Sequence, residues 1–498
     1  MILTCEQMRE SEERLFASGV EVGPVMEKAG AGLADVVNRV YPGPGRLLAF
    51  VGKGHNGGDA LVAARLLAEW GWTTNVLLVP GREGLAELTE EKLGEYESVR
   101  EAAGDYGVVG GWGSRRLVML DGLLGLGATG PLRGLYAEAA AEMNRLRHDE
   151  GALTVAVDIP TGVNGDDGSV AEGAVVADMT VTMAQVKAGL LVESAGHHVG
   201  RLEVVALDEI EPVGGDESKV LLGERRLKRW LPRRAFDFHK GDAGRVAVIA
   251  GSRGFTGAAD LCSRAAVASG AGLVTLYAHE SIYEVMATRA GAEVMVRPVV
   301  DYREVMNDHL DAIAIGPGLG LDCAEAILEI VEKDERPMVV DADALNAVAG
   351  ADVEGVLGRS AGVRLLTPHP GEMARLWPGR PEGMARVEAA REFAKRTGVT
   401  LLWKGARTLI VEEGLPAAYN ATGHPGMASG GMGDVLTGIT SAWMAQGLGA
   451  YEAGGLGSWL LGRSAERAAW SGLAAEESVT ASEVILGLGQ ALWELRGE

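Results

Sequence analysis

Residues 52–59 read Gly52-Lys53-Gly54-His55-Asn56-Gly57-Gly58-Asp59, directly after an apolar run at residues 46–51. The run predicts a buried strand, and the apolar pattern over residues 59–70 predicts a helix. Glycines between a strand and a helix let the backbone turn tightly, and they let N–H groups approach a ligand closely. This strand–turn–helix unit indicates an α/β fold with a parallel sheet, whose ligands bind at the carboxyl ends of the strands.

The alternation of strand and helix patterns continues along the chain. An acidic, aperiodic segment at residues 208–218 contains Pro and Gly and predicts a linker. We therefore expect two tandem α/β domains, at residues 1–210 and 220–498. In the first we expect helices at residues 6–17, 22–40 and 59–70, and strands at 46–51, 74–79, 117–120 and 154–157. In the second we expect strands at residues 245–250, 273–277, 312–315, 338–340, 363–366 and 400–403.

Composition excludes several classes of function. The formal net charge of −23 argues against a nucleic-acid or anionic-membrane partner, because such binders present a basic surface. The three cysteines are far apart and odd in number, which suits a reducing cytosol and no disulfide framework. The N-terminus lacks a basic and apolar leader, and no apolar run approaches membrane-spanning length. We expect a cytoplasmic protein.

Polar side chains follow several predicted strands of the first domain. The Gly52–Gly57 stretch fits the dinucleotide fingerprint, but the next strand ends in Val79-Pro80, without an acid to bind a ribose. This weakens an NAD-dependent redox function. Oxygens of Asn56, Asp121 and Thr161, at the ends of different strands, would suit a hard cation. Each aspartate alone would be explained by a turn or a cap, whereas several at successive strand ends favour a site.

A second glycine-rich corner reads Gly430-Gly431-Met432-Gly433-Asp434 and runs into an apolar helix at residues 435–445. Converging N–H groups at a helix N-terminus accept a phosphate or a developing oxyanion. Asp434 at this junction could be a helix N-cap, or a general base beside a transferring phosphate. The two roles are compatible.

The first half of the chain carries four motifs in a characteristic order. They are Ile2-Leu3-Thr4 with Glu6-Gln7-Met8, the loop at residues 52–59, Asp121-x-x-x-Gly125-x-Gly127, and Val157-Asp158-Ile159-Pro160-Thr161-Gly162. Together they resemble the NAD(P)H-hydrate epimerase (YjeF N-terminal) domain over about residues 1–210. The resemblance implies a Rossmann-like parallel-sheet domain.

It also implies site residues. Asp158 would be catalytic and lie at the substrate, and K⁺ would bind Asn56, Asp121 and Thr161. The residues that would hold the hydrated nicotinamide nucleotide are Asp158 together with His55, Asn56, Gly57, Gly58, Asp59, Gly125, Leu126, Gly127, Ala128, Thr129, Gly130 and Pro131.

The second half carries another ordered set. Its motifs are His239-Lys240-Gly241, the stretch at residues 251–258, Gly316-Pro317-Gly318-Leu319-Gly320, Asp341-Ala342-Asp343-Ala344-Leu345, Thr367-Pro368-His369-Pro370-Gly371-Glu372, Trp403-Lys404-Gly405-Ala406 and the corner at Asp434. These resemble the ADP/ATP-dependent NAD(P)H-hydrate dehydratase over about residues 220–495, which implies a ribokinase-like α/β domain.

The resemblance implies that Asp434 is the catalytic base and that Glu372 organises Mg²⁺ near the phosphates of the co-substrate ADP. The residues facing the hydrate would be Ala258, Gly318, His369 and Asp434. The residues holding the nucleotide would be Lys404, Gly405, Ala406, Arg407, Thr408 and Gly433.

The leading hypothesis is a bifunctional repair enzyme that acts on the hydrates of NADH and NADPH. The first domain would epimerise the R and S forms, and the second would dehydrate the S form at the expense of ADP, releasing AMP and phosphate. We also expect a homo-oligomer. One alternative is a vitamin or sugar kinase of the same fold fused to an accessory domain. His369, where such kinases tend to carry Asn, favours the dehydratase. A first domain that only binds nucleotide, as a scaffold, is a third possibility.

Overall fold

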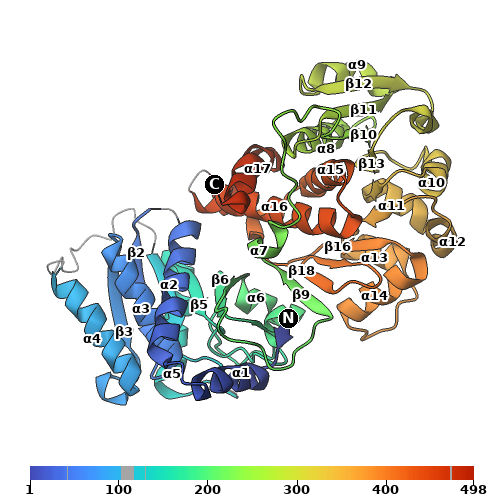
Figure 1. Cartoon of the computed structure of the whole chain (residues 1–498). Coiled ribbons are helices and arrows are strands. Elements are labelled where there is room, and N and C mark those ends of the chain that lie inside the picture. The colour runs from blue at the N-terminus through green and yellow to red at the C-terminus, as the bar shows by residue number, and fades with distance from the viewer. Residues whose placement is uncertain (42, 103–116, 129, 472–473, 498) are drawn as a thin grey trace. The chain divides into compact units, whose positions relative to one another are not determined.

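The computed structural model describes residues 1–41, 43–102, 117–128, 130–471 and 474–497. The chain divides into two compact units, Met1–Glu217 and Ser218–Glu498 (Figure 1). Each unit has its own sheet flanked by helices, so the predicted class of two tandem α/β domains is confirmed. Across these ranges, no helix combines the length and the apolar character needed to cross a membrane.

The first unit is built on a six-stranded parallel sheet in the order β3-β2-β4-β5-β6-β8. A separate short pair joins β1 to β7 in parallel. The strands are β1 (Ile2–Leu3), β2 (Arg46–Val51), β3 (Thr73–Leu78), β4 (Leu117–Gly122), β5 (Leu153–Val157), β6 (Met179–Met183), β7 (Val186–Lys187) and β8 (Arg201–Val205). The helices are α1 (Cys5–Ala17), α2 (Val22–Val40), α3 (His55–Glu69), α4 (Glu87–Ala102), α5 (Gly134–Glu150) and α6 (Gly196–Val199).

Apolar side chains fix the helices of this unit on the sheet. Helix α5 packs Ala140 and Met143 against Phe50 and Met119 of the central strands, and all four are fully buried. Helix α3 packs between α2 and α4. It begins at His55, and the prediction of a start at Asp59 was wrong. Only small residues allow this early start, because a Cβ at Gly57 would lie 2.2 Å from the Gly52 carbonyl oxygen.

The second unit is built on a ten-stranded sheet in the order β12-β11-β10-β13-β14-β15-β16-β17-β18-β9. All neighbouring strands are parallel except at β16–β17 and β17–β18, which are antiparallel. The strands are β9 (Lys219–Leu222), β10 (Arg245–Ile249), β11 (Leu273–His279), β12 (Val294–Val299), β13 (Ala312–Ile315), β14 (Met338–Val340), β15 (Arg364–Leu366), β16 (Thr400–Trp403), β17 (Leu409–Val411) and β18 (Ala417–Asn420).

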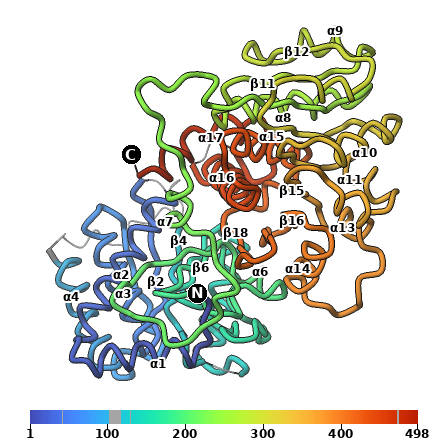
Figure 2. The backbone as a smooth tube through the Cα atoms, turned by 45° about the vertical axis from the view of Figure 1, so that its right-hand side comes forward, coloured from blue at the N-terminus to red at the C-terminus, as the bar shows by residue number. Residues whose placement is uncertain are grey.

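Its longest helices gather beside one another, as Figure 2 shows for α15, α16 and α17. The helices are α7 (Glu224–Leu227), α8 (Thr256–Ala268), α9 (Glu280–Arg289), α10 (Ala324–Lys333), α11 (Ala342–Ala349), α12 (Val353–Gly358), α13 (Pro370–Leu376), α14 (Arg386–Thr397), α15 (Met432–Ala445), α16 (Ala450–Trp470) and α17 (Ala481–Arg496). Helices α8 and α15 approach so closely that a Cβ at Gly438 would lie 2.1 Å from the carbonyl oxygen of Cys262.

The cap of helix α15 differs from one of the predicted possibilities. Helix α15 has Gly431 as its N-cap, with φ of 95°, so Asp434 is inside the first turn and is not the N-cap. The glycine takes the cap position because the chain turns there through the left-handed region, which favours a residue without a Cβ.

In the predicted linker, Asp216 exchanges two backbone hydrogen bonds with Ile2, at 3.3 and 2.8 Å, which fasten this segment to the N-terminus.

Candidate functional site

The first candidate site lies at the carboxyl ends of β4 and β5. The Asp121 carboxylate is fully buried and accepts hydrogen bonds of 2.7 Å from both the N–H and the Oγ1 of Thr161. Asn56, in the first turn of α3, donates to the carbonyl oxygens of Leu124 (3.0 Å) and Val157 (2.8 Å). The three residues predicted to hold a cation thus come together from three different strand ends.

The chemistry of this cluster suits a hard cation of low charge. Burial raises the pKa of Asp121 to about 6, although hydrogen bonds from Thr161 and Leu123 favour its ionised form. In the parts of the chain that are described, no group of three or more His, Cys, Asp or Glu is arranged around a metal position. A cation here would therefore depend on one carboxylate together with amide, hydroxyl and carbonyl oxygens, a donor set that transition metals do not favour.

Asp158 follows β5 in a left-handed conformation, with φ of 65°. Its Oδ1 atom accepts hydrogen bonds from Thr182 Oγ1 (2.9 Å), Met183 N (3.0 Å) and Lys187 Nζ (2.5 Å). The Oδ2 atom has no hydrogen bond to any described residue. Lys187 is 1% exposed, and sequence reasoning missed it. A buried ion pair thus orients the carboxylate through one oxygen and leaves the other for a ligand.

Asn56 and Asp158 open onto a cavity of about 450 Å³ in the first unit. Its lining includes the predicted substrate residues His55, Asn56, Asp59, Gly125, Leu126, Gly127, Ala128 and Asp158. Gly57 and Gly58 do not line it, since both are buried in α3, where a Cβ at Gly58 would lie 2.5 Å from Met26 Sδ. Gly130 and Pro131 line a neighbouring cavity of about 520 Å³. Thr129 lies outside the described residues.

The cavity also has a wall that sequence reasoning did not assign. Arg9, Glu12 and Phe16 of α1 line it, at a spacing of three and four residues that places them on one face of the helix. This spacing was visible in the sequence, but nothing in it showed that the face would cover a site.

The second candidate site surrounds Asp434 in the first turn of α15. Burial and the negative charge of Asp341 raise the pKa of the Asp434 carboxyl to about 7, although the ammonium of Lys404 opposes both. A carboxyl that titrates near neutrality can take a proton from a substrate hydroxyl at physiological pH.

Asp341, which follows β14, is the centre of the polar network around this carboxyl. Its Oδ1 atom accepts from Lys404 Nζ at 2.8 Å, and its Oδ2 atom accepts from Thr437 Oγ1 at 2.8 Å. Lys404 Nζ also lies 3.8 Å from Glu372. The network joins β14, the end of β16, α13 and α15. The motif around Asp341 was noticeable in the sequence, but this role was not predicted.

The predicted substrate residues of this unit lie near its glycine turns. His369 is the N-cap of α13, where its Nδ1 accepts from the N–H of Gly371 at 2.9 Å, and its side chain is 50% exposed. Gly318 has φ of 61°, and a Cβ there would meet Ala258 Cβ at 3.0 Å. Ala258 and Gly318 are therefore in contact, and a larger side chain at position 318 would clash with Ala258.

The predicted nucleotide segment, Lys404 to Thr408, forms a tight turn between β16 and β17. The Arg386 guanidinium donates to the carbonyl oxygens of Trp403 (2.7 Å), Lys404 (3.1 Å) and Arg407 (2.9 Å). Gly405 and Ala406 are exposed, while Arg407 is buried. The ammonium of Lys404 faces away from this turn, toward Asp341, and a Cβ at Gly433 would lie 3.4 Å from it.

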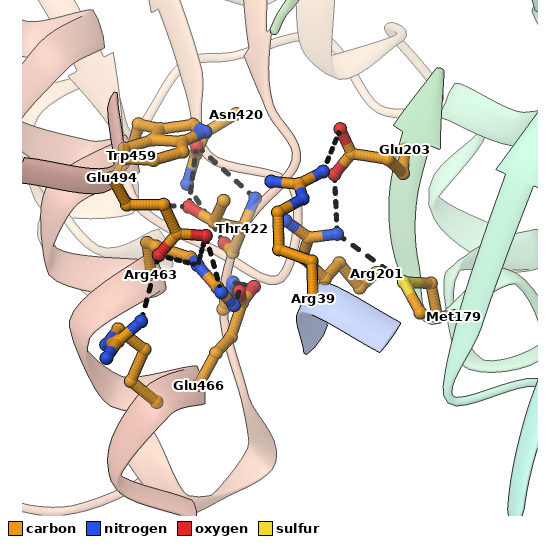
Figure 3. Close-up of polar contacts among 12 residues, drawn as sticks. Arg39, Met179, Arg201, Glu203, Asn420, Thr422, Trp459, Arg463, Glu466 and Glu494 are labelled. Atoms are coloured by element: carbon orange, nitrogen blue, oxygen red, sulfur yellow. Dashed lines mark hydrogen bonds and ion pairs between the residues drawn. The ribbon is translucent and has the colours of Figure 1, made fainter. Parts of the chain in front are cut away.

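A buried charge network supports the loop that leads into α15 (Figure 3). Glu466 of α16 is fully buried, and its Oε1 accepts from the N–H of Gly423 at 2.8 Å. Its Oε2 accepts from Arg463 Nη1 at 3.0 Å, and Arg463 Nη2 donates to Glu494 of α17 at 2.7 Å. Thr422 Oγ1 donates to the carbonyl oxygen of Trp459 at 2.9 Å. Helices α16 and α17 thereby fix the start of the loop.

Both halves of the chain match known protein families. The family model described as YjeF-related protein N-terminus matches residues 23–189, and the model described as NAD(P)H-hydrate dehydratase matches residues 246–485. The bifunctional NAD(P)H-hydrate repair enzyme of Moorella thermoacetica is 35% identical, covering 89% of this chain and 88% of that protein. The corresponding enzyme of Escherichia coli K12 is 32% identical, covering 92% and 87%.

A solved structure resembles the second unit. The ribokinase-like superfamily protein from Enterococcus faecalis V583 superposes with a TM-score of 0.51 at 25% sequence identity. The match covers 58% of this chain and 100% of that protein.

Proposed function

The chain belongs to the family of bifunctional NAD(P)H-hydrate repair enzymes, and from this premise we propose that its two units divide the repair. The first unit interconverts the R and S hydrates of NADH and NADPH. The second unit dehydrates the S hydrate to the reduced cofactor at the expense of ADP. The alternative of a vitamin or sugar kinase fused to a scaffold is not favoured, because the model that matches the second unit is that of the dehydratase.

In the second unit, dehydration requires a better leaving group than hydroxide. Transfer of a phosphoryl group to the hydroxyl of the hydrate provides one. The nitrogen lone pair then expels phosphate as a C=N⁺ bond forms, and loss of a proton from the adjacent ring carbon to solvent restores the ring double bond and the lone pair. Asp434 takes the hydroxyl proton, and the N–H groups at the start of α15 bind the transferring phosphoryl group. The observation that carries this proposal is a buried carboxyl with a pKa of about 7 at a helix N-terminus.

The neighbours of Asp434 have supporting roles in this proposal. Lys404 pairs with Asp341 at 2.8 Å, so the two charged groups are held in fixed positions. The turn at residues 404–408 and Gly433 bind the nucleotide, and Ala258, Gly318 and His369 bind the hydrate. Mg²⁺, when bound with the nucleotide, neutralises phosphate charge. Glu372, 7% exposed and 3.8 Å from Lys404, is the carboxylate that would hold it, directly or through water.

In the first unit, the hydrate occupies the cavity beside Asp158. The free Oδ2 atom of Asp158 exchanges a proton with the substrate, while Lys187 holds Oδ1. The glycine-rich segment around Gly125 to Ala128 contacts the nucleotide. K⁺, when bound by Asn56, Asp121 and Thr161, supplies positive charge at the strand ends. We further propose that the protein is a cytoplasmic homo-oligomer.

The assignment of the two reactions can be tested with one variant. Asp434→Asn should abolish nucleotide-dependent recovery of dihydronicotinamide absorbance from the S hydrate, because the amide cannot accept the proton. It should leave the interconversion of R and S hydrates, followed by chromatography, unchanged. Glu413→Gln, at an exposed position in the turn after β17, is the matched control and should retain both activities. Near-normal dehydration by Asp434→Asn would refute the general-base role. Parallel assays with ADP and ATP identify the preferred donor.

A further inference from the structure

Helix α1 forms one wall of the cavity in the first unit. Arg9, Glu12 and Phe16 line the cavity from this helix, while Asp158 lines it from the end of β5. Arg9 Nη2 donates to the carbonyl oxygen of Leu126 at 3.1 Å, which ties the helix to the glycine-rich segment of the same cavity. Glu12, one turn further along, is thus held at the cavity beside the predicted substrate residues.

Several contacts fix the position of α1. Thr4 and Gln7 form a reciprocal capping box at its N-terminus, with bonds of 3.1 and 2.9 Å. The preceding strand pairs Leu3 with Lys187, the lysine that holds Asp158. Ser11 accepts from the N–H of Val213 at 2.9 Å. The helix that carries Glu12 is therefore attached to the strand that carries the partner of Asp158.

The carboxyl of Glu12 has no hydrogen bond or ion pair with any described residue. Burial, and to a lesser extent the negative charge of Asp158, raise its pKa to about 7. The other charged groups that act on it are Lys187 and Arg9, which lower its pKa, and Glu13, which raises it. Asp59 of α3 lines the same cavity, and burial, Asp158 and Glu12 together raise the pKa of Asp59 well above its usual value.

Two carboxyls of one cavity therefore differ in their surroundings. Asp158 is paired with the Lys187 ammonium at 2.5 Å, whereas Glu12 has no such partner among the described residues. Environments that separate the proton affinities of two carboxyls are the usual basis for one acid and one base in the same site.

We propose that Glu12 is a second catalytic carboxyl of the first unit, which works with Asp158 as the acid–base pair of hydrate epimerisation. This inference rests on the proposed function of that unit. It adds a carboxyl from α1 to the one that Asp158 contributes from the end of β5.

The reaction balances as follows. In the hydrate, the hydroxyl is on the ring carbon bonded to nitrogen. Protonated Glu12 donates its proton to the hydroxyl, the C–O bond breaks with its electron pair leaving on water, and the nitrogen lone pair forms a C=N⁺ bond. Water then adds to the other face, its electron pair forms the new C–O bond, and ionised Asp158 takes its proton. The nitrogen recovers its lone pair. One proton has passed from Glu12 to Asp158, and exchange with solvent through the cavity restores both groups.

The test compares Glu12→Gln with two variants of the same helix. Glu13→Gln removes the adjacent carboxyl, which is exposed and does not line the cavity. Glu12→Asp keeps an acid at the position. We expect Glu12→Gln to lower kcat for epimerisation at least about a hundredfold with little change in KM, the usual size for loss of a general acid or base. Glu13→Gln should keep kcat for epimerisation near the wild-type value. Glu12→Asp should retain part of the rate that Glu12→Gln loses.

The pH profile separates a catalytic role from a structural one. Because Glu12 acts in its protonated form, wild type should lose epimerase activity as pH rises above about 7. This fall in activity should be absent from the pH profile of Glu12→Gln. Epimerisation in H₂¹⁸O should introduce ¹⁸O into the product hydrate. Dehydration of pure S hydrate by the same variant serves as the check on folding. If wild type epimerises and Glu12→Gln does so equally well, or shows the same fall in activity, the role of Glu12 is refuted. If wild type does not epimerise at all, the proposed function of the unit fails instead.

Discussion

Lys187 Nζ and Asp158 Oδ1 form a buried ion pair at 2.5 Å, and the two side chains are 1% and 8% exposed. Lys187 Nζ also donates to Thr182 Oγ1 at 3.1 Å and to the Met183 carbonyl oxygen at 2.9 Å. The lysine therefore compensates the charge of the carboxylate and fixes its orientation. The behaviour of Asp158 should depend on this pairing, and loss of the carboxylate should affect only the first reaction.

The first prediction concerns a mixture of R and S hydrates. Asp158→Ala should consume the S fraction quickly in the presence of ADP and then slow to the spontaneous rate of epimerisation, because the second unit accepts one configuration. Wild type should consume both epimers in one fast course. The time course of dihydronicotinamide absorbance measures this directly. A single fast phase to completion in the variant would exclude the first unit as the epimerase and support a scaffold.

The second prediction concerns pH. The base form of Asp434 is the ionised one, so dehydration should fall as pH drops below about 7, by about tenfold per pH unit once the group is mostly protonated. Asp341→Asn removes the charge that raises the pKa of Asp434, so its acid limb should move to lower pH. Profiles of kcat/KM report the limb whatever the absolute rate. Asp343, the weakest of the four causes acting on Asp434, provides the control, since Asp343→Asn should move the limb less.

The third prediction concerns potassium. Asp121→Asn keeps the shape of the side chain and an acceptor for the Thr161 N–H, but it removes the one negative charge of the cluster. The variant should need more than about tenfold higher KCl for half-maximal epimerase activity, since one charge is worth about 1.4 kcal/mol or more at a buried site. Titration with KCl against NaCl measures the response. Stoichiometric zinc in the purified protein, or an unaltered potassium response, would contradict the assignment.

The fourth prediction concerns the network of Glu466, Arg463 and Glu494. Glu466→Ala leaves Arg463 without its buried carboxylate partner and the Gly423 N–H without its acceptor. Breaking a buried ion pair costs about 3–5 kcal/mol, so thermal unfolding of the variant should begin at a clearly lower temperature. Arg467→Ala, at a 36% exposed side chain on the edge of the network, should cost under about 1 kcal/mol. Equal effects of both variants would show that burial of the network contributes little.

The parallel strands and both glycine-rich corners could be predicted because their signals are local. Apolar runs of the right length marked β2, β13, β14 and β16 at or near their observed bounds, and glycines marked the turns that follow strands. The order of the strands could not be read in the same way. The hairpin of β17 and β18 has a local turn with Gly414 in positive φ, which was not recognised in the sequence. The pairing of β18 with β9, from far earlier in the chain, depends on a contact that no local pattern encodes.

The same distinction holds for the candidate sites. Asp121, Asp158 and Asp434 follow strands or begin helices, so their positions were visible in the sequence. Lys187 and Glu12 were not, because Lys187 bonds to an aspartate distant in sequence and Glu12 lines a cavity formed by distant segments. The possibility that Asp434 is the helix N-cap was wrong for a local reason, since Gly431, with positive φ, is in the cap position.

The contact of Gly438 with Cys262 has a consequence for motion. Gly438 lies one helical turn beyond Asp434, and the backbones of α15 and α8 touch there without an intervening side chain. Two helices in such close contact cannot slide past each other without a clash, since packed interiors yield little. Asp434, the proposed general base, is therefore held in a fixed position. A change of shape during a catalytic cycle in this unit should therefore involve the surrounding loops rather than a sliding of α15 against α8.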